Sequence, residues 1–475
     1  AAEHEPDAWF LVGFGWGPAS AAALFMCALA ELAALATLSE PTEGCAETSP
    51  WLNKVQKGID AMLMAAVVGI DSVVESITVP LLPELSRGEG MQALYFIKPF
   101  LASTTALLLP LLLQSGVHRG RFVAAAGLVF LSFSCFALAV ETSFMIVLMA
   151  RVITAVSSAG ILVSTFHTVM LQAPPDRVGW RLNIAMSGLA IGQASGPWCG
   201  SLLMRSFGMH AMFGALSAAA AAVCCMHLAT TMWIVKMPGS CQRCHPLERG
   251  LSGSVMKAAS LLLGDVKQCV LLAGVGLSAA VLSLHSTMVP AYLAGPGAPP
   301  ETAELLFACS SVGLTVALLV LACGAGVDAA TESWAFRSMV VAHVAVVLGL
   351  RALVDGQTAG QPLSCLLGFF ASQAGNGAFM GLAMPIALRI SRGCSAIPTL
   401  STSAVASTAL GTAWLFGDAL GVGLQVSLHH AVGFRYTILA FAAVVALHAM
   451  TLIAQPLSYR KPLDLMASSP EELDG

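Results

Sequence analysis

Long apolar runs constrain this chain more than any other feature of its sequence. Runs of about twenty or more apolar residues recur along it, and each is long enough to cross about 30 Å of hydrocarbon as a helix. Only 10% of the residues are charged, whereas soluble domains carry about 25%, so too little polar surface remains to face water. Lipid admits only helices and closed barrels, and barrel strands would alternate apolar and polar residues. The sequence therefore predicts an all-α polytopic membrane protein.

The apolar segments form two sets of six, separated by a longer polar stretch between Lys236 and Lys267. Two bundles joined by a linker, with the substrate site between them near the midplane, are a recurrent layout of secondary transporters. We expect an N-terminal segment over 1–58, bundles over 59–235 and 268–457, a linker over 236–267 and a tail over 458–475. The twelve segments lie at about 60–83, 92–114, 121–140, 143–172, 180–204, 209–235, 268–294, 302–326, 335–355, 361–388, 399–428 and 433–456.

Lysine and arginine placement predicts the orientation. If the segment before the first helix, the even-numbered loops and the C-terminal tail are cytoplasmic, that side holds most of the 22 Lys and Arg residues. The opposite side holds only Arg87, Arg205, Arg351 and Arg435. Cytoplasmic loops of membrane proteins carry such an excess of basic residues. We therefore expect both ends of the twelve-helix core in the cytoplasm, and the protein in a vesicle, organelle or plasma membrane.

A further apolar stretch, residues 9–38, precedes the twelve segments. Gly15, Gly17, Pro18 and Glu31 interrupt it. Three interpretations stay open: an extra span, the remnant of a signal anchor, or a helix lying along the bundle.

The first helix carries acidic residues inside its apolar run. Asp71, Glu75 and Thr78 follow an i, i+4, i+7 spacing, which puts them on one helix face. A charged side chain near the bilayer centre costs about 2.5–3.5 kcal/mol on insertion scales, so such residues have partners or tasks. A carboxyl that meets each side of the membrane in turn can load and release a proton, which favours a water-filled path along this face. The alternative is a structural charge that pairs with a basic residue of the same bundle.

Three further charged residues lie inside predicted helices. Lys98 in the second helix and Arg151 in the fourth are placed to neutralise the acids of the first. Asp418 in the eleventh helix is expected to pair with Lys98 across the bundle interface; alternatively, it is a polar residue hydrated near a helix end. The histidines of the spans, His285 and His343, are expected to be satisfied core residues.

The fifth helix has small residues at every fourth position, namely Gly188, Gly192, Gly196 and Gly200, with Pro197 among them. Small residues let helices approach closely, and proline removes one helical hydrogen bond and introduces a bend. We expect this pattern at a bundle interface that rocks during gating.

These residues resemble motifs of the major facilitator superfamily. Gly188 to Gly200 resembles the antiporter motif in helix five of its drug:proton antiporters. Leu148-Met-Ala-Arg151, followed by Ser157-Ser158, resembles their helix-four motif, whose arginine is linked to proton transfer. Asp71, followed nine residues later by Pro80-Leu-Leu-Pro83, resembles helix one of the vesicular amine transporters for monoamines, acetylcholine or polyamines.

Two strings of the second bundle, Met380-Gly-Leu-Ala-Met384 and Gly417-Asp-Ala-Leu-Gly421, extend the resemblance over about residues 51–456. It implies a major facilitator fold with about twelve helices, and antiport of protons against a small organic cation by alternating access. As hypotheses, three groups of residues carry this function. They are Asp71, Glu75 and Ser72 for substrate binding; Asp71, Glu75, Arg151 and Asp418 for proton coupling; and Lys98, Asp418, Gly192, Gly196, Pro197 and Gly200 for gating.

Some positions depart from the family's pattern. Val289, Met380 and Gly411 stand where the family carries acids in helices seven, ten and eleven. Two alternatives therefore stay open: a proton-independent facilitator of a neutral solute, and a membrane receptor that binds a ligand without moving it.

The remaining features argue against other classes of protein. No nucleophile–base pair or metal cluster can be read from the sequence, so we expect neither an enzyme nor a cofactor. The string Cys241-Gln-Arg-Cys244-His245 matches a haem-attachment motif, but the linker is too short to wrap a haem, and three ligands are fewer than a structural zinc site needs. The net charge of −4 and the lack of a basic patch give no sign of nucleic-acid binding. The expected partners are a small organic solute, protons and the lipid bilayer, and the chain is expected to be monomeric.

Overall fold

The computed structural model describes nine stretches of the chain. The apolar stretch 9–38, the Cys241–His245 string, Val289 and the tail 458–475 lie outside the described residues. The described stretches are 50–85, 90–113, 117–173, 177–236, 264–287, 300–323, 332–359, 361–393 and 400–455.

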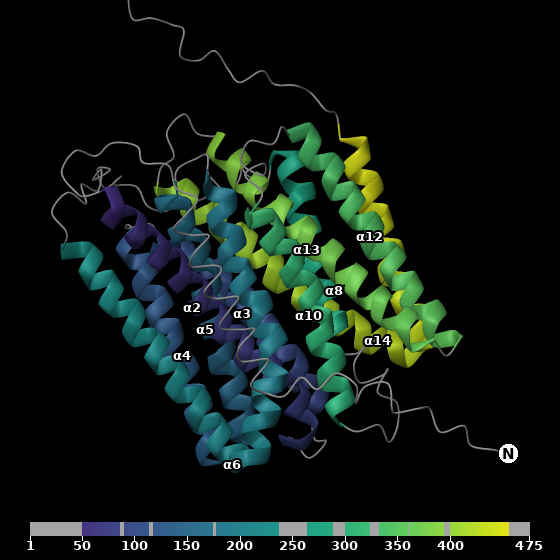
Figure 1. Ribbon diagram of the computed structural model, residues 1–475, viewed down its shortest axis with the longest axis horizontal. Helices are drawn as coiled ribbons and strands as arrows, with labels where there is room; N and C mark the ends of the chain where they lie inside the picture. The colour runs from purple at the N-terminus through teal and green to yellow at the C-terminus, as the bar shows by residue number, and fades with distance from the viewer. Residues whose placement is uncertain are drawn as a thin grey trace, which may run out of the picture.

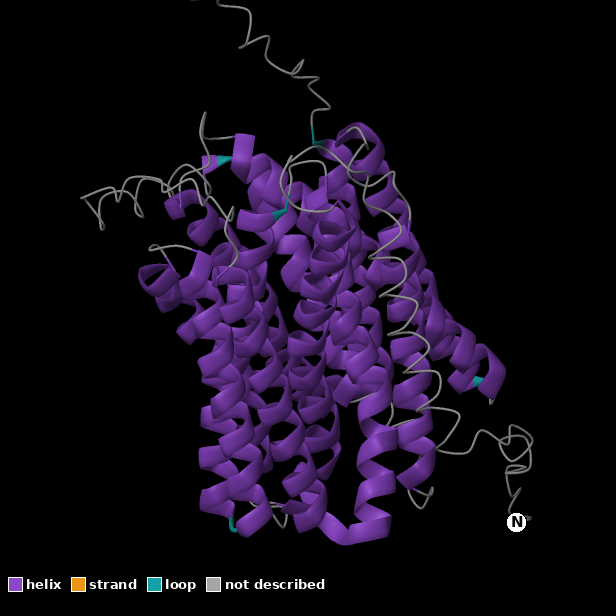
Figure 2. Cartoon of the chain, turned by 60° about the vertical axis from the view of Figure 1, so that its left-hand side comes forward, coloured by secondary structure: helices purple, strands orange, loops and turns teal. Residues whose placement is uncertain are grey.

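These stretches fold into helices and contain no strand. The helices form two groups that lie side by side, the N-terminal one from α2 to α6 and the C-terminal one from α8 to α14 (Figures 1 and 2). Their bounds are α2 Pro50–Leu85, α3 Met91–Leu113, α4 Val117–Val140, α5 Phe144–Gln172, α6 Val178–Lys236, α8 Val266–Thr287, α10 Pro300–Cys323, α12 Glu332–Thr358, α13 Pro362–Gly393 and α14 Leu400–Ala454.

Two of these elements are each a pair of helices joined at a glycine. Gly208 within α6 has φ 83° and ψ 169°, and Gly433 within α14 has φ 81° and ψ 171°. Only glycine adopts this region readily, because it lacks a Cβ. Dividing α6 and α14 there gives twelve helical segments in the described chain, in the places that the apolar pattern predicts. The two breaks occupy the same position in the two groups, after the fifth and the eleventh segment.

Nine helices in the described part of the chain are long and apolar enough to cross a membrane. The described apolar portion of α10, Ser311–Ala322, is shorter, and α13 buries Ser372, Gln373 and Asn376 in its middle. Large apolar side chains cover the outer faces; Leu108 of α3, for example, is 64% exposed. This distribution suits a helical protein surrounded by lipid.

The closest helix pairs match between the two groups. In the N-terminal group α6 packs along α2, and in the C-terminal group α14 packs along α8. A Cβ on Gly192 of α6 would overlap the carbonyl oxygen of Gly69, and one on Gly417 of α14 would overlap that of Gly276. The groups meet mainly where α10 contacts α6 and where α14 contacts α3 and α5.

Candidate functional site

A cavity of about 100 Å³ lies between the two helix groups, lined by α2, α3, α5 and α6 on one side and by α8 and α14 on the other. It contains the charged residues that the sequence singles out, which are Asp71, Glu75, Lys98, Arg151 and Asp418. Its volume is below the about 300–1,000 Å³ of typical small-molecule sites. In this conformation the cavity therefore suits a small solute.

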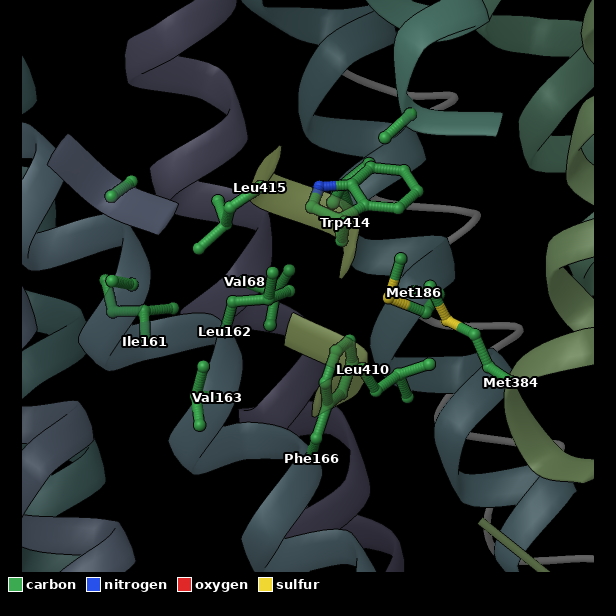
Figure 3. Packing of buried hydrophobic residues seen from close by; sticks show 14 of the residues in the cluster. Val68, Ile161, Leu162, Val163, Phe166, Met186, Met384, Leu410, Trp414 and Leu415 are labelled. Atoms are coloured by element: carbon green, nitrogen blue, oxygen red, sulfur yellow. The ribbon is translucent and has the colours of Figure 1, made fainter. Parts of the chain in front are cut away.

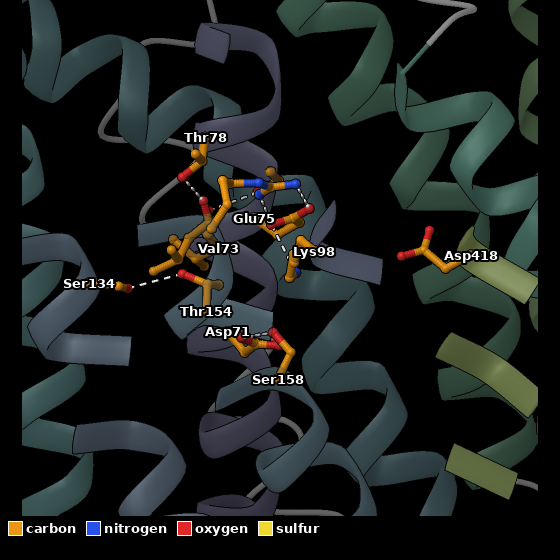
Figure 4. Close-up of polar contacts among 12 residues, drawn as sticks. Asp71, Val73, Glu75, Thr78, Lys98, Ser134, Thr154, Ser158 and Asp418 are labelled. Carbon is orange, nitrogen blue, oxygen red and sulfur yellow. Dashed lines mark hydrogen bonds and ion pairs between the residues drawn. The ribbon is translucent and has the colours of Figure 1, made fainter. Parts of the chain in front are cut away.

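Glu75 is held by two bases at once. Arg151 donates from Nη1 at 2.8 Å and from Nη2 at 3.2 Å to the two carboxylate oxygens, and Lys98 Nζ lies 2.8 Å from Oε2 (Figure 4). Arg151 also donates from Nε to the carbonyl oxygen of Leu94 at 3.3 Å, which fixes the guanidinium plane. The Arg151 and Lys98 side chains are 3% and 8% exposed. One acid and two bases leave this cluster with one net positive charge.

Asp71 lies one turn before Glu75 on the same face of α2, as the spacing predicts. Its Oδ1 accepts a hydrogen bond from Ser158 of α5 at 2.7 Å. Among the described residues no Lys or Arg forms an ion pair with Asp71. Ser72 also lines the cavity and is buried. Thr78 does not line it, because its hydroxyl donates to the carbonyl oxygen of Val74 in its own helix at 2.6 Å.

Asp418 faces the cavity from the opposite wall. Ser283 of α8 donates its hydroxyl to Asp418 Oδ1, and no ion pair to this acid is found in the described part of the chain. The expected Lys98–Asp418 pair is therefore wrong for this conformation, since Lys98 binds Glu75 within its own group. The alternative, hydration near a helix end, does not fit either, because Asp418 lies in the middle of the first segment of α14.

The glycines of the fifth helix lie elsewhere than expected. Gly192, Gly196 and Gly200 face α2, where added Cβ atoms would meet Gly69, Ser76 and Ile77. These contacts are inside the N-terminal group, so the pattern does not form the interface between the two groups. Pro197 lies within α6 beside them, and the non-helical break in α6 is at Gly208 instead.

Apolar side chains from both groups close one end of the cavity. Val68, Leu162 and Phe166 meet Leu410 and Met384 in one buried cluster (Figure 3). Each lies toward the end of its helix on the side where α2 begins, which is the predicted cytoplasmic side. We call these five residues the apolar plug. It separates Asp71 from that side.

Four lining residues were not singled out from the sequence, although three of them carried a positional signal. Tyr95 lies one turn before Lys98 and Trp414 one turn before Asp418, and Gln193 lies within the glycine string. Ser283 carried no signal, because only the packing of α8 on α14 brings it to Asp418.

Histidines of the spans are core residues in one case and a pair in another. His285 contacts Val281 O at 2.7 Å and Ser372 Oγ at 2.7 Å, so both ring nitrogens are satisfied, as expected. His343 Nε2 lies 2.9 Å from Nδ1 of His448, while its own Nδ1 has no partner among the described residues. Within the described chain, no group of three or more potential ligands could hold a metal ion.

No protein-family model matches the sequence, and no curated protein matches it either. Solved structures do match the fold. A fucose:proton symporter from E. coli, FucP, superposes with a TM-score of 0.58 at 13% identity, covering 83% of this chain and 98% of that one. The proton:xylose symporter XylE, described as a major facilitator superfamily protein, superposes with a TM-score of 0.61 at 11% identity, covering 90% and 96%. The chain therefore has the major facilitator fold.

Proposed function

We propose that this protein is a secondary transporter that exchanges protons for a small organic cation by alternating access. The observation that carries the proposal is the cavity between the two helix groups, in which Asp71 and Asp418 have no cationic partner among the described residues. The proposal includes the predicted cytoplasmic placement of both ends and a monomeric chain.

The position of the cavity supports alternating access. Transporters of this fold bind their solute between two helix bundles that rock around a fixed site. Here the apolar plug closes the predicted cytoplasmic side with residues from both groups, so rocking the groups apart would break it. Such a seal opens and closes without breaking ion pairs.

The charges of the cavity support exchange. An ionised carboxyl without a counter-ion is costly inside a membrane, so Asp71 would be occupied either by a proton or by the cation of the solute. Because one carboxyl binds the two in turn, they compete, and competition at a site that faces each side alternately produces antiport. Glu75 acts in this conformation as a fixed counter-charge to Lys98 and Arg151.

A second candidate is a proton-independent facilitator of a neutral solute. Two positions where related antiporters carry acids favour it. Met380 is fully buried in the apolar core, and a Cβ on Gly411 would contact Val163 of α5. The solved neighbours are described as transporters of sugars, which are neutral solutes, although they are also described as proton-coupled.

Liposomes with an acidic lumen and a trapped pH dye test the proposal. Organic amines added outside should trigger proton efflux that protein-free liposomes do not show. Asp71→Asn should abolish it, and Asp355→Asn, which removes an acid from an exposed surface pair with Arg351, should not. Uptake of labelled neutral solutes that ignores the pH gradient would select the facilitator. Ligand binding with no movement of any solute would select a receptor.

A further inference from the structure

The three acids of the cavity are not equivalent. Glu75 takes both bases, whereas Asp71 and Asp418 each have one serine hydroxyl as their hydrogen-bond donor. A carboxylate with one neutral donor is poorly compensated in a low-dielectric site. The cavity therefore has two places for a positive charge that the described residues do not fill.

These two acids belong to opposite walls. Asp71 is on α2 and Asp418 is on α14, and Figure 4 shows Asp418 across the cavity from Asp71. Much of the remaining lining is apolar, including Leu162, Leu189 and Trp414. Two separated negative groups with apolar surface on the same cavity match a molecule with a positive charge at each end and methylenes between.

We propose that the solute is an organic dication of this kind, an α,ω-diamine, with one ammonium group on Asp71 and the other on Asp418. This inference rests on the proposed exchange function and names its substrate class. A single ammonium group would satisfy only one of the two acids. A dication satisfies both and also links the two helix groups, because each end is bound by a different group.

The charge balance is the same in both loaded states. When Asp71 and Asp418 each carry a proton, the cavity holds one net positive charge, that of Glu75 with Lys98 and Arg151. When both are ionised and a dication is bound, the net charge is again one. Two protons thus exchange for one dication without changing the charge that crosses the membrane with the site.

Gln193 supplies a further feature of the cavity. Its Oε1 atom is buried and accepts no hydrogen bond from any described residue, and the residue lines the cavity on α6. A primary ammonium group has three N–H donors, more than one carboxylate and one hydroxyl accept in a single direction. The Gln193 carbonyl oxygen is an additional acceptor for it.

Binding to the purified protein in detergent tests the inference without passive entry of amines into vesicles. The probes are a series of α,ω-diaminoalkanes of increasing chain length, each compared with the alkylamine of equal carbon number. We expect an affinity optimum at one chain length, roughly tenfold above the matched alkylamine, equivalent to about 1.4 kcal/mol. Asp418→Asn should remove this ratio. Asp418→Glu should move the optimum to a shorter diamine, because its carboxyl reaches further into the cavity. Asp355→Asn is the matched control and should change neither.

Each outcome separates this inference from the proposed function. Diamines that bind no tighter than alkylamines at any length, while alkylamines still release protons from acidic liposomes, would overturn the dication and leave antiport in place. A diamine preference that persists in Asp418→Asn, with an unmoved optimum in Asp418→Glu, would overturn the bridging role of Asp418. Proton release by no organic cation at all would remove the proposed function and this inference together.

Discussion

Glu75 determines how the charges of the cavity are divided. Its carboxylate binds Arg151 through two hydrogen bonds and Lys98 through one ion pair, and both bases are buried. Removing one member of a buried charge cluster leaves the others uncompensated and is strongly destabilising. Because Glu75 takes both bases, Asp71 and Asp418 are left without one.

A double-mutant cycle on Lys98 measures this division. Lys98→Met combined with Glu75→Gln should show a coupling free energy of unfolding within about 0.5–3 kcal/mol, the range for residues in contact. Lys98→Met combined with Asp418→Asn should be close to additive, because the ion pair of Lys98 is with Glu75. The measurement is denaturation of the purified protein in detergent. Strong coupling to Asp418 and none to Glu75 would mean that another conformation dominates.

Sequence reasoning reached the charged residues of the site but not all of their partners. The i, i+4 spacing places Asp71 and Glu75 on one face, because both lie on one helix. Which acid Lys98 pairs with depends on how α3 sits against α2, and a helix pattern carries no such information. Likewise, Ser283 comes to Asp418 through the packing of two helices far apart in the chain.

At the scale of the elements, glycine contacts hold the first helix of each group against the fifth. A Cβ on Gly192 would overlap Gly69 of α2, and a Cβ on Gly417 would overlap Gly276 of α8. Helices approach this closely only where side chains are absent. Asp71 projects from the first helix of its group and Asp418 from the fifth helix of the other, so these tight pairs position both acids.

Alanine substitution tests these contacts. Gly192→Ala and Gly417→Ala should each lower the midpoint of thermal unfolding in detergent. Overpacking typically costs about 1–3 kcal/mol, which over most of this range exceeds the roughly 1 kcal/mol that alanine gains over glycine in a helix. Gly214→Ala is the control, because its Cβ would lie 4.0 Å from the nearest atom, the Cβ of Ala139. It should leave the midpoint unchanged or raise it. Equal midpoints for all three variants would show that the helix pairs are not held this tightly.

The helices themselves were predictable to a large extent. Apolar runs of sufficient length give the twelve segments, and the breaks at Gly208 and Gly433 fall where the runs were divided. The glycine string was recognised, but its partner was not. Small-residue spacing shows that a helix is approached closely, and it does not say whether the neighbour is in the same group or the other one.

In the whole molecule, contacts between the two groups concentrate on the predicted cytoplasmic side of the cavity. The apolar plug spans the groups there, and Asn183 of α6 donates to the carbonyl oxygen of Gly381 in α13 at 3.2 Å. Long-range packing of this kind depends on the conformation, so a sequence pattern cannot predict which side is closed. Alternating access requires these contacts to separate in every cycle.

A disulfide across this interface should stop transport. A Cβ built on Gly411 of α14 lies 3.6 Å from the Cβ of Val163 in α5, within the about 3.5–4.5 Å that a disulfide requires. Val163→Cys with Gly411→Cys, oxidised in proteoliposomes, should lose solute-driven proton efflux, and a reductant should restore it. Mass spectrometry of the cross-linked peptides verifies the bond among the 13 native cysteines.

The matched control is a disulfide inside one group. Gly214→Cys with Ala139→Cys has a Cβ separation of 4.0 Å and joins α6 to α4 of the N-terminal group. Because the helices of one group move together in alternating access, this bond should form and leave proton efflux intact. Efflux that continues with the Val163–Gly411 positions fully cross-linked would contradict separation of the two groups on this side. Loss of efflux with both bonds would mean that motion within a group, and not only between groups, is part of the transport cycle.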